Sequence, residues 1–99
     1  MNEDTDLETP LTFIVCAAIR HDDGLIICGA RHYDPVMTQV LFALGYSMEN
    51  RPRGFTTGFI DNKGEYLTRE QAWIIAERAG QIRYHGIGTP GTCYSENLY

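Results

Sequence analysis

The sequence predicts an α+β fold, a small antiparallel sheet with two helices packed on it in a single domain. Two observations lead to this prediction. A pair of strand-like segments flanks an Asp-Gly turn, and two later segments each have a helix start, an apolar stripe and a glycine at the end. At 99 residues the chain can bury one small core, so we expect one domain over residues 10–99 that is helped by oligomerisation.

The first two strands are expected on either side of residue 22. Residues 11–20 are rich in apolar and β-branched side chains at both odd and even positions, as in a central strand buried on both faces. Residues 21–24, His-Asp-Asp-Gly, supply the turn, and residues 25–30 return as the second strand. The two strands are therefore predicted to form an antiparallel hairpin.

The first helix is expected to begin at Asp34 and Pro35. Aspartate is a good N-cap, and proline suits the first helical position. Gly45 follows the last apolar residue and can end the helix in the left-handed conformation. The spacing predicts one buried stripe that contains Val36, Met37, Val40, Leu41 and Leu44.

A third strand is expected at about Phe55–Asp61, followed by an Asn-Lys-Gly turn and a second helix over residues 69–79. Thr68 and Gln71 have the spacing of a capping box, and Gly80 can end the helix. The inward stripe is predicted to contain Ala72, Ile75, Ala76 and Ala79.

The rest of the chain has less regular patterns. Residues 1–9 are acidic and have little to bury, so we expect this N-terminal segment to be disordered, and residues 47–53 read as a polar loop. The segment Tyr94–Tyr99 contains two tyrosines and a leucine, and is expected to dock on its own domain or on a second copy.

Charge and cysteine content exclude several classes of protein. The net charge is −5, but four of the thirteen acids lie in the first nine residues, which leaves a nearly neutral domain. This argues against a protein that binds a nucleic-acid duplex, which would need a basic face, so we expect no nucleic-acid partner. No apolar run approaches the roughly 20 residues of a membrane span, and the polar start is unlike a signal peptide. The three cysteines lack metal-site spacing, so we expect a soluble, reduced, cytosolic protein without a metal or cofactor.

An enzymatic function finds little support in the sequence. The segment 69–80 superficially resembles a Nudix helix, but Glu70 and Glu77 are too far apart to hold magnesium together, so we reject that match. The three histidines have no motif spacing. A phosphodiesterase or hydrolase that uses two distant histidines stays open as the alternative function.

Ligand binding is better supported. Arg31, Arg69 and Arg83 are expected at the junctions of strands and helices, and planar guanidinium groups suit phosphates and stacked bases. Arg69 in a helical first turn gains nothing from the helix dipole, so it either faces an anion together with the helix end or points to water or a nearby glutamate. Aromatic residues that could stack on a base, or equally belong to the core, are Phe55, Phe59, Tyr66 and Tyr84.

Four segments together resemble the type 1 Thoeris anti-defence proteins of phages. They are residues 27–34 (ICGARHYD), 58–73 (GFIDNKG through TREQAW), 79–82 (AGQI) and 94–99 (YSENLY). The resemblance implies a non-enzymatic sponge that binds cyclic ADP-ribose isomers in the cytoplasm of the infected bacterial host. It also implies a homo-oligomer, with dimers that gather into hexamers, and a separate site for cyclic oligonucleotides in some members.

The same resemblance assigns the site residues. Arg31 in the Gly-Ala-Arg-His segment and Arg83 after Gly-Gln-Ile are the expected phosphate and ribose contacts, and either Phe55 or Phe59 is the expected support for adenine. His32, Arg69 and Gln81 lie within the same segments and complete the predicted ligand-binding set. For His32, a bond to the start of the first helix remains an equal alternative.

Overall fold

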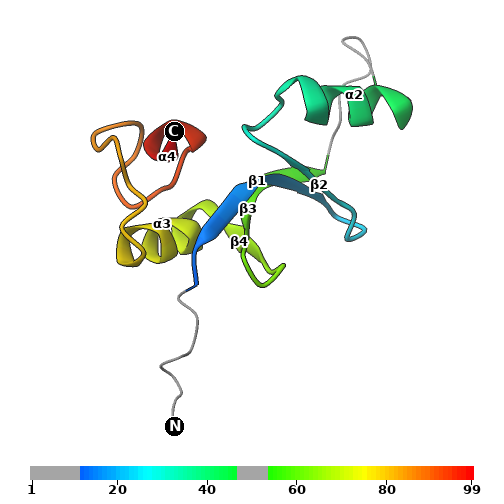
Figure 1. The fold of residues 1–99 in the computed structure, drawn as a ribbon. Helices are drawn as coiled ribbons and strands as arrows, with labels where there is room; N and C mark the ends of the chain where they lie inside the picture. The colour runs from blue at the N-terminus through cyan, green and yellow to red at the C-terminus, as the bar shows by residue number, and fades with distance from the viewer. Residues whose placement is uncertain (1–11, 47–53) are drawn as a thin grey trace, which may run out of the picture.

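The computed structural model describes residues 12–46 and 54–99, which form a single domain with one four-stranded antiparallel sheet and three helices (Figure 1). The predicted α+β class is confirmed. The disordered N-terminal segment predicted for residues 1–9 and the polar loop predicted for residues 47–53 lie outside the described residues. Within the described ranges, no helix has the length and apolar composition needed to cross a membrane.

The sheet has the strand order β2-β1-β3-β4, and every neighbouring pair is antiparallel. The predicted hairpin and the central position of its first strand are confirmed. A short strand before the second helix was not predicted. The strands are β1 (Ile14–His21), β2 (Ile26–Gly29), β3 (Phe55–Asp61) and β4 (Tyr66–Thr68).

The helices are α2 (Pro35–Ala43), α3 (Arg69–Arg78) and α4 (Ser95–Leu98). Both predicted helix starts are confirmed. The Asp34 carboxylate accepts a hydrogen bond from the Met37 N–H at 2.8 Å, and the Thr68–Gln71 capping box forms in both directions, at 3.0 and 3.1 Å. The glycines after these helices have the expected positive φ, +99° at Gly45 and +72° at Gly80.

All three helices cover the same face of the sheet. Ala17 and Ile19 are two residues apart on β1 and therefore point to the same side. Ala17 belongs to a core cluster with Phe59 and residues of α3 and α4, while Ile19 belongs to a second cluster with β2 and α2. Figure 1 shows the corresponding arrangement, with α2 at one end of the sheet and α3 and α4 at the other. The opposite face of the sheet carries no helix of the described chain.

The predicted buried stripes are too wide. On α2 only Met37 and Leu41 are buried, while Val36, Val40 and Leu44 are 59%, 39% and 50% exposed. Periodicity predicts which side of a helix is apolar but not how much of that side a neighbour covers, and α2 packs on little more than Ile19 and Ile27. On α3 the alanines at 72 and 76 are buried as expected, with Ile75 packed beside them.

The segment after α3 docks on its own domain, as one of the two alternatives predicted. Cys93 and Leu98 are buried in the first cluster. The side chain of Asn97 is completely buried, where its amide donates to the Tyr84 carbonyl and its carbonyl accepts from the Tyr94 N–H, each at 2.8 Å. Because both ends of this amide are satisfied, α4 is held firmly although it has only four residues.

Candidate functional site

Three of the predicted site residues meet along one segment, residues 93–99, which we call the closing segment. In the order of the closing segment, Arg69 contacts its first two residues, His32 contacts Ser95, and Arg31 contacts Glu96 and Tyr99. Arg31 and His32 come from the loop after β2, and Arg69 from the start of α3. Arg69, His32 and Arg31 therefore lie side by side along the closing segment, and we call these three residues with their contacts in that segment the row.

Arg69 does not point to water or pair with Glu65 or Glu70 in the contacts that the structure records. Its Nε donates to the Thr57 hydroxyl at 2.9 Å, and one terminal nitrogen donates to the Cys93 carbonyl at 2.8 Å. The guanidinium carbon lies 4.8 Å from the centre of the Tyr94 ring. These acceptors are neutral, so they orient the guanidinium plane without cancelling its charge.

His32 lies in the middle of the row and does not bond the start of α2. Its Nε2 lies 2.7 Å from the Gly58 carbonyl, which can only accept, so Nε2 carries the proton and Nδ1 can accept from the Ser95 hydroxyl at 3.1 Å. The ring packs edge-on against Phe59, with 5.0 Å between ring centres. Burial lowers the pKa of His32 below its usual value, and the nearby positive charge of Arg69 lowers it further. The imidazole is therefore held neutral.

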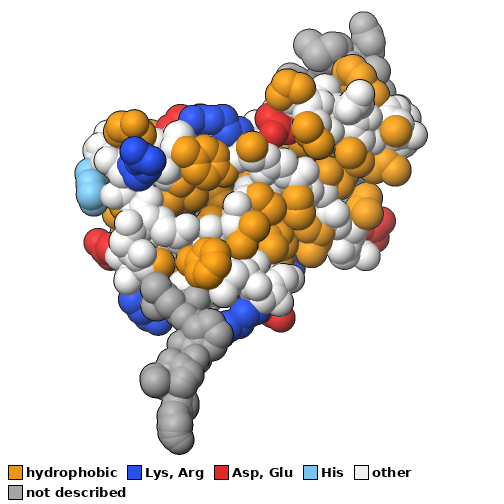
Figure 2. Space-filling view, viewed as in Figure 1, with side chains coloured by type: hydrophobic (Ala, Val, Ile, Leu, Met, Phe, Trp, Pro, Cys, Tyr) orange, Lys and Arg blue, Asp and Glu red, His pale blue; other side chains and the backbone are white. Residues whose placement is uncertain are grey.

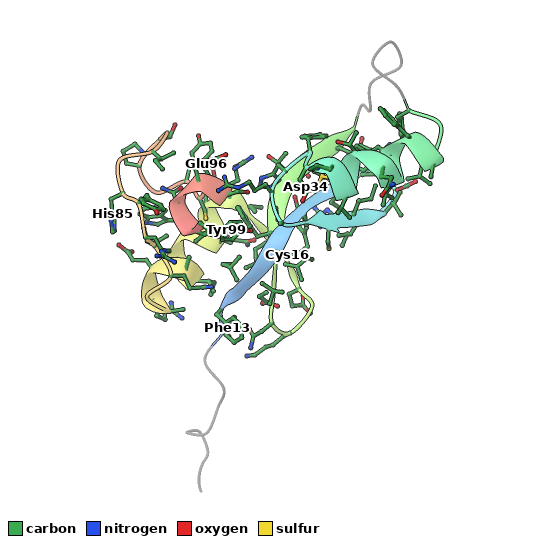
Figure 3. All side chains as sticks on the ribbon, turned by 45° about the horizontal axis from the view of Figure 1, so that its top comes forward. Phe13, Cys16, Asp34, His85, Glu96 and Tyr99 are labelled. Atoms are coloured by element: carbon green, nitrogen blue, oxygen red, sulfur yellow. The ribbon has the colours of Figure 1, made fainter. Side chains whose placement is uncertain are left out.

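Arg31 holds the far end of the closing segment. One terminal nitrogen lies 3.2 Å from the Glu96 carboxylate, and the other donates to the main-chain oxygen of Tyr99. The guanidinium carbon is 5.4 Å from the centre of the Tyr99 ring, whose hydroxyl donates to the Ala30 carbonyl. Figure 3 shows Tyr99 on the side of α4 that faces β1, where Cys16 lies. Two arginine–tyrosine stacks therefore flank the histidine.

The other predicted residues lie outside this row. Phe59 is completely buried in the core and offers no open ring face in this structure, whereas Phe55 is half-buried in the second cluster beside His21. Gln81 binds the start of β1, because its amide donates to the Ile14 carbonyl at 2.9 Å and accepts from the Ile14 N–H at 2.7 Å.

Arg83 is exposed and is joined to α4 through its backbone N–H, which donates to the Asn97 carbonyl. Among the predicted arginines that the structure describes near the closing segment, Arg83 is the one whose side chain has no recorded contact with that segment.

Sequence reasoning did not assign the residues of the closing segment that complete the row. Tyr94 and Tyr99 supply the aromatic faces, and Ser95 and Glu96 supply the polar contacts. The signal that could have pointed to them is the segment YSENLY, in which three polar residues and a leucine lie between two tyrosines over about one helical turn.

Two surface hollows lie elsewhere, and neither is lined by a residue of the predicted set. One has a volume of about 360 Å³ on the outer side of α2, where Pro35 and Phe42 lie. The other has a volume of about 320 Å³ at the end of β1, beside Arg20 and His21. Among the residues described, no group of three or more histidine, cysteine or acidic side chains is placed to hold a metal ion.

The fold and the row define a small α+β domain whose own closing segment contacts two arginines and a neutral histidine. The family model for the phage T4 y16D protein matches residues 13–99. The chain therefore belongs to the phage T4 y16D protein family, which is a family of phage proteins. No curated protein and no solved structure matches the chain.

Proposed function

We propose that this chain is an anti-defence sponge that binds cyclic ADP-ribose-type signalling nucleotides and sequesters them without cleaving them. The observation that supports this most is the row of Arg69, His32 and Arg31 along the closing segment. Guanidinium forks with adjacent tyrosine rings are the groups that recognise phosphates and bases. Membership of a phage protein family and the similarity of four segments to Thoeris anti-defence proteins support the same function.

The closing segment contacts these arginines with the same kinds of group that a nucleotide has, oxygen acceptors and aromatic ring faces. Cys93 presents a carbonyl oxygen and Tyr94 a ring face to Arg69, while Glu96 and Tyr99 present a carboxylate and a ring face to Arg31. A bound nucleotide would therefore either extend these stacks at the surface or replace part of them. The exposed Arg83 is bonded to α4 through its backbone, and in our proposal it adds a phosphate contact in either case.

The alternative is a nucleotide phosphodiesterase or hydrolase, and the Ser95–His32 hydrogen bond is the observation that favours it. A hydroxyl that donates to a neutral histidine is the first part of a nucleophilic dyad. Ser95 is only 2% exposed, however, so its hydroxyl cannot reach a substrate without movement of α4. We therefore favour binding without cleavage.

Recovery of the ligand separates the two functions. The protein is incubated with a cyclic ADP-ribose isomer in the presence of chelator, then heated, and the released nucleotide is identified by chromatography. A sponge returns the intact ring and shows a higher melting temperature with ligand than without it, because the ligand prefers the folded state. Conversion to a linear product would support the hydrolase. The absence of both a thermal shift and conversion with every isomer tested would contradict both functions.

The Arg83→Ala variant tests most directly the phosphate contact that we propose for Arg83. Because Arg83 is exposed, the substitution should leave the melting temperature unchanged, while loss of a charge-assisted contact of about 1.5–3 kcal/mol should weaken binding roughly tenfold to a hundredfold. Arg78→Ala removes an exposed arginine from the last turn of α3 and is the matched control. Equal affinities of the two variants would place the phosphate elsewhere.

A further inference from the structure

Cys16 and Cys28 lie on neighbouring strands and point to the same side of the sheet, the side opposite the helices. The register pairs Ala18 of β1 with Cys28 of β2, and Cys16 lies two residues before Ala18, so all three share one face. The two cysteines are therefore diagonal neighbours, and their thiols interact. Burial, and then the charge of Cys28 and a hydrogen bond with its thiol, raise the pKa of Cys16 to about 11. Two sulfur atoms that are far apart in the sequence thus form a pair.

The pair is open on one side and covered on the other. Cys28 is exposed, Cys16 is half-buried, and Ala18 beside them has only a methyl group. Tyr99 lies on the covered side, because its hydroxyl donates to the Ala30 carbonyl, and burial together with the charge of Cys16 raises its pKa. A small ion can therefore reach the sulfurs past Cys28 and is shielded from solvent on the side of Cys16.

The chemistry of the pair suits a soft cation. Figure 2 shows a largely hydrophobic surface over β1 and β2, with charged side chains mostly around its margin. Strongly hydrated ions such as Mg²⁺ need oxygen ligands, whereas thiolates select soft ions such as Cu(I) or borderline ions such as zinc. Structural zinc takes four ligands, and in the part of the chain that the structure describes no third histidine, cysteine or acidic side chain joins the pair. Cu(I) accepts two thiolates in a nearly linear arrangement.

We propose that Cys16 and Cys28 hold one Cu(I) ion between their sulfurs. The ion takes the position of the hydrogen that the two thiols share. Two copper–sulfur bonds form and two S–H bonds break, so one Cu(I) and two thiols give a complex with one negative charge and two protons released to water. The oxidation state of copper does not change. The inference does not rest on the proposed function, because it requires no nucleotide.

An inserted ion fits the diagonal better than a direct disulfide does. A disulfide needs Cβ atoms about 3.5–4.5 Å apart, while even directly opposite residues of paired strands have Cβ atoms about 4.5–5.5 Å apart and diagonal ones are farther. Two metal–sulfur bonds of about 2.3 Å in line place the sulfurs about 4.6 Å apart. The ion therefore spans a separation that an S–S bond of about 2.05 Å would have to close by moving the strands.

The test uses Cu(I) alone as the probe. The reduced protein is titrated under anaerobic conditions with Cu(I) held by bicinchoninate, and the loss of the colour of the chelate measures transfer of the ion to the protein. We expect one ion per chain and an ultraviolet thiolate-to-copper absorption band. Because up to two protons are released, the apparent affinity should rise by up to about a hundredfold per pH unit.

Three matched variants locate the ion. Cys28→Ser and Cys16→Ala each remove one sulfur of the pair, whereas Cys93→Ala removes the third cysteine, which is buried in the first core cluster. Loss of a group that only supports a ligand weakens metal binding about 10–100-fold, so loss of a ligand should weaken it at least about a hundredfold, with the wild-type affinity kept in Cys93→Ala. Circular dichroism and melting curves verify folding. Cys28 is exposed, so Cys28→Ser should fold even if Cys16→Ala does not.

Three outcomes would overturn the proposal. Equal affinities of the wild type and Cys28→Ser would show that the pair does not hold the ion. Wild-type affinity in a folded Cys16→Ala would show that Cys28 binds copper alone. One ion per two chains would show that the ion bridges Cys28 residues of different molecules. Nucleotide binding is measured on separate, copper-free samples, so none of these outcomes bears on the proposed function.

Discussion

Replacement of His32 by alanine should be one of the most destabilising single changes in the row. The ring satisfies the Gly58 carbonyl at 2.7 Å and the Ser95 hydroxyl at 3.1 Å, and it packs against Phe59 in the core. Each buried polar group left without a partner costs about 1–3 kcal/mol, and the lost ring burial adds about 1 kcal/mol. We therefore expect a loss of about 3–7 kcal/mol, out of the 5–15 kcal/mol that is typical of a domain.

Urea unfolding followed by circular dichroism measures this loss as a lower midpoint at an unchanged slope. Ser95→Ala is the control, because it removes only one of the two hydrogen bonds and should cost about 1 kcal/mol. If His32→Ala costs no more than Ser95→Ala, the imidazole does not hold the closing segment on the sheet and our account of the row is wrong.

The pH dependence of the free energy of unfolding gives a second, independent test of the role of His32. Burial and Arg69 lower the pKa of His32 in the folded protein, while in the unfolded chain it lies near 6.5. Above about pH 6.5 both states are neutral at this ring and its stabilising contribution is complete. Below that value the unfolded chain binds a proton that the folded protein does not, so stability falls by up to about 1.4 kcal/mol per pH unit until the folded pKa is passed.

The difference in free energy of unfolding between wild type and His32→Ala isolates this effect from the carboxylates, which titrate in both proteins. We expect the difference to shrink as the pH falls from 7 to 5. A difference that stays constant over this range would show that His32 is not held neutral, and a difference that grows would indicate a protonated, stabilising imidazolium instead.

Three further changes test the scaffold around the row by the same unfolding measurement. Gly58→Ala should be strongly destabilising, because a Cβ there would lie 2.2 Å from the Leu67 carbonyl oxygen; a cost below about 1 kcal/mol would contradict the close approach of β3 and β4. Thr68→Ala removes the helix cap of α3 and should cost about 1 kcal/mol, whereas Thr68→Ser should cost much less. Gln81→Ala leaves both polar groups of Ile14 without this partner and should cost about 1–3 kcal/mol, with faster hydrogen exchange at the Ile14 amide; unchanged exchange would mean that the contact does not hold β1.

Features of the fold that depend only on residues close together in the sequence could be predicted. Asp34 with Pro35, and Thr68 with Gln71, form their caps within three or four positions, so local spacing was sufficient. The strand β4 was missed because its three residues lead directly into α3 and its last residue, Thr68, is also the helix cap. A segment this short has no periodicity to detect.

The row could be predicted only in part, because its contacts join distant parts of the chain. Arg31 reaches Tyr99 across 68 positions, and His32 reaches Ser95 across 63. The motif segments drew attention to Arg31, His32 and Arg69, but no spacing rule could show that these residues meet along α4. The complete burial of Phe59 could not be predicted either, because the sequence of a strand does not show which of its two faces the helices cover.

The two core clusters differ in when they can form as the chain leaves the ribosome. The cluster around Ile19, Ile27, Met37 and Leu41 needs only the hairpin and α2, so it can assemble after less than half of the chain has been synthesised. The other cluster joins Ile14 to Leu98 and must wait for nearly the whole chain. Contacts between such distant residues form slowly compared with local contacts, so the part of the sheet that this cluster covers stays exposed during synthesis. A nascent chain that stops before residue 93 lacks Cys93 and Leu98 and cannot complete this cluster.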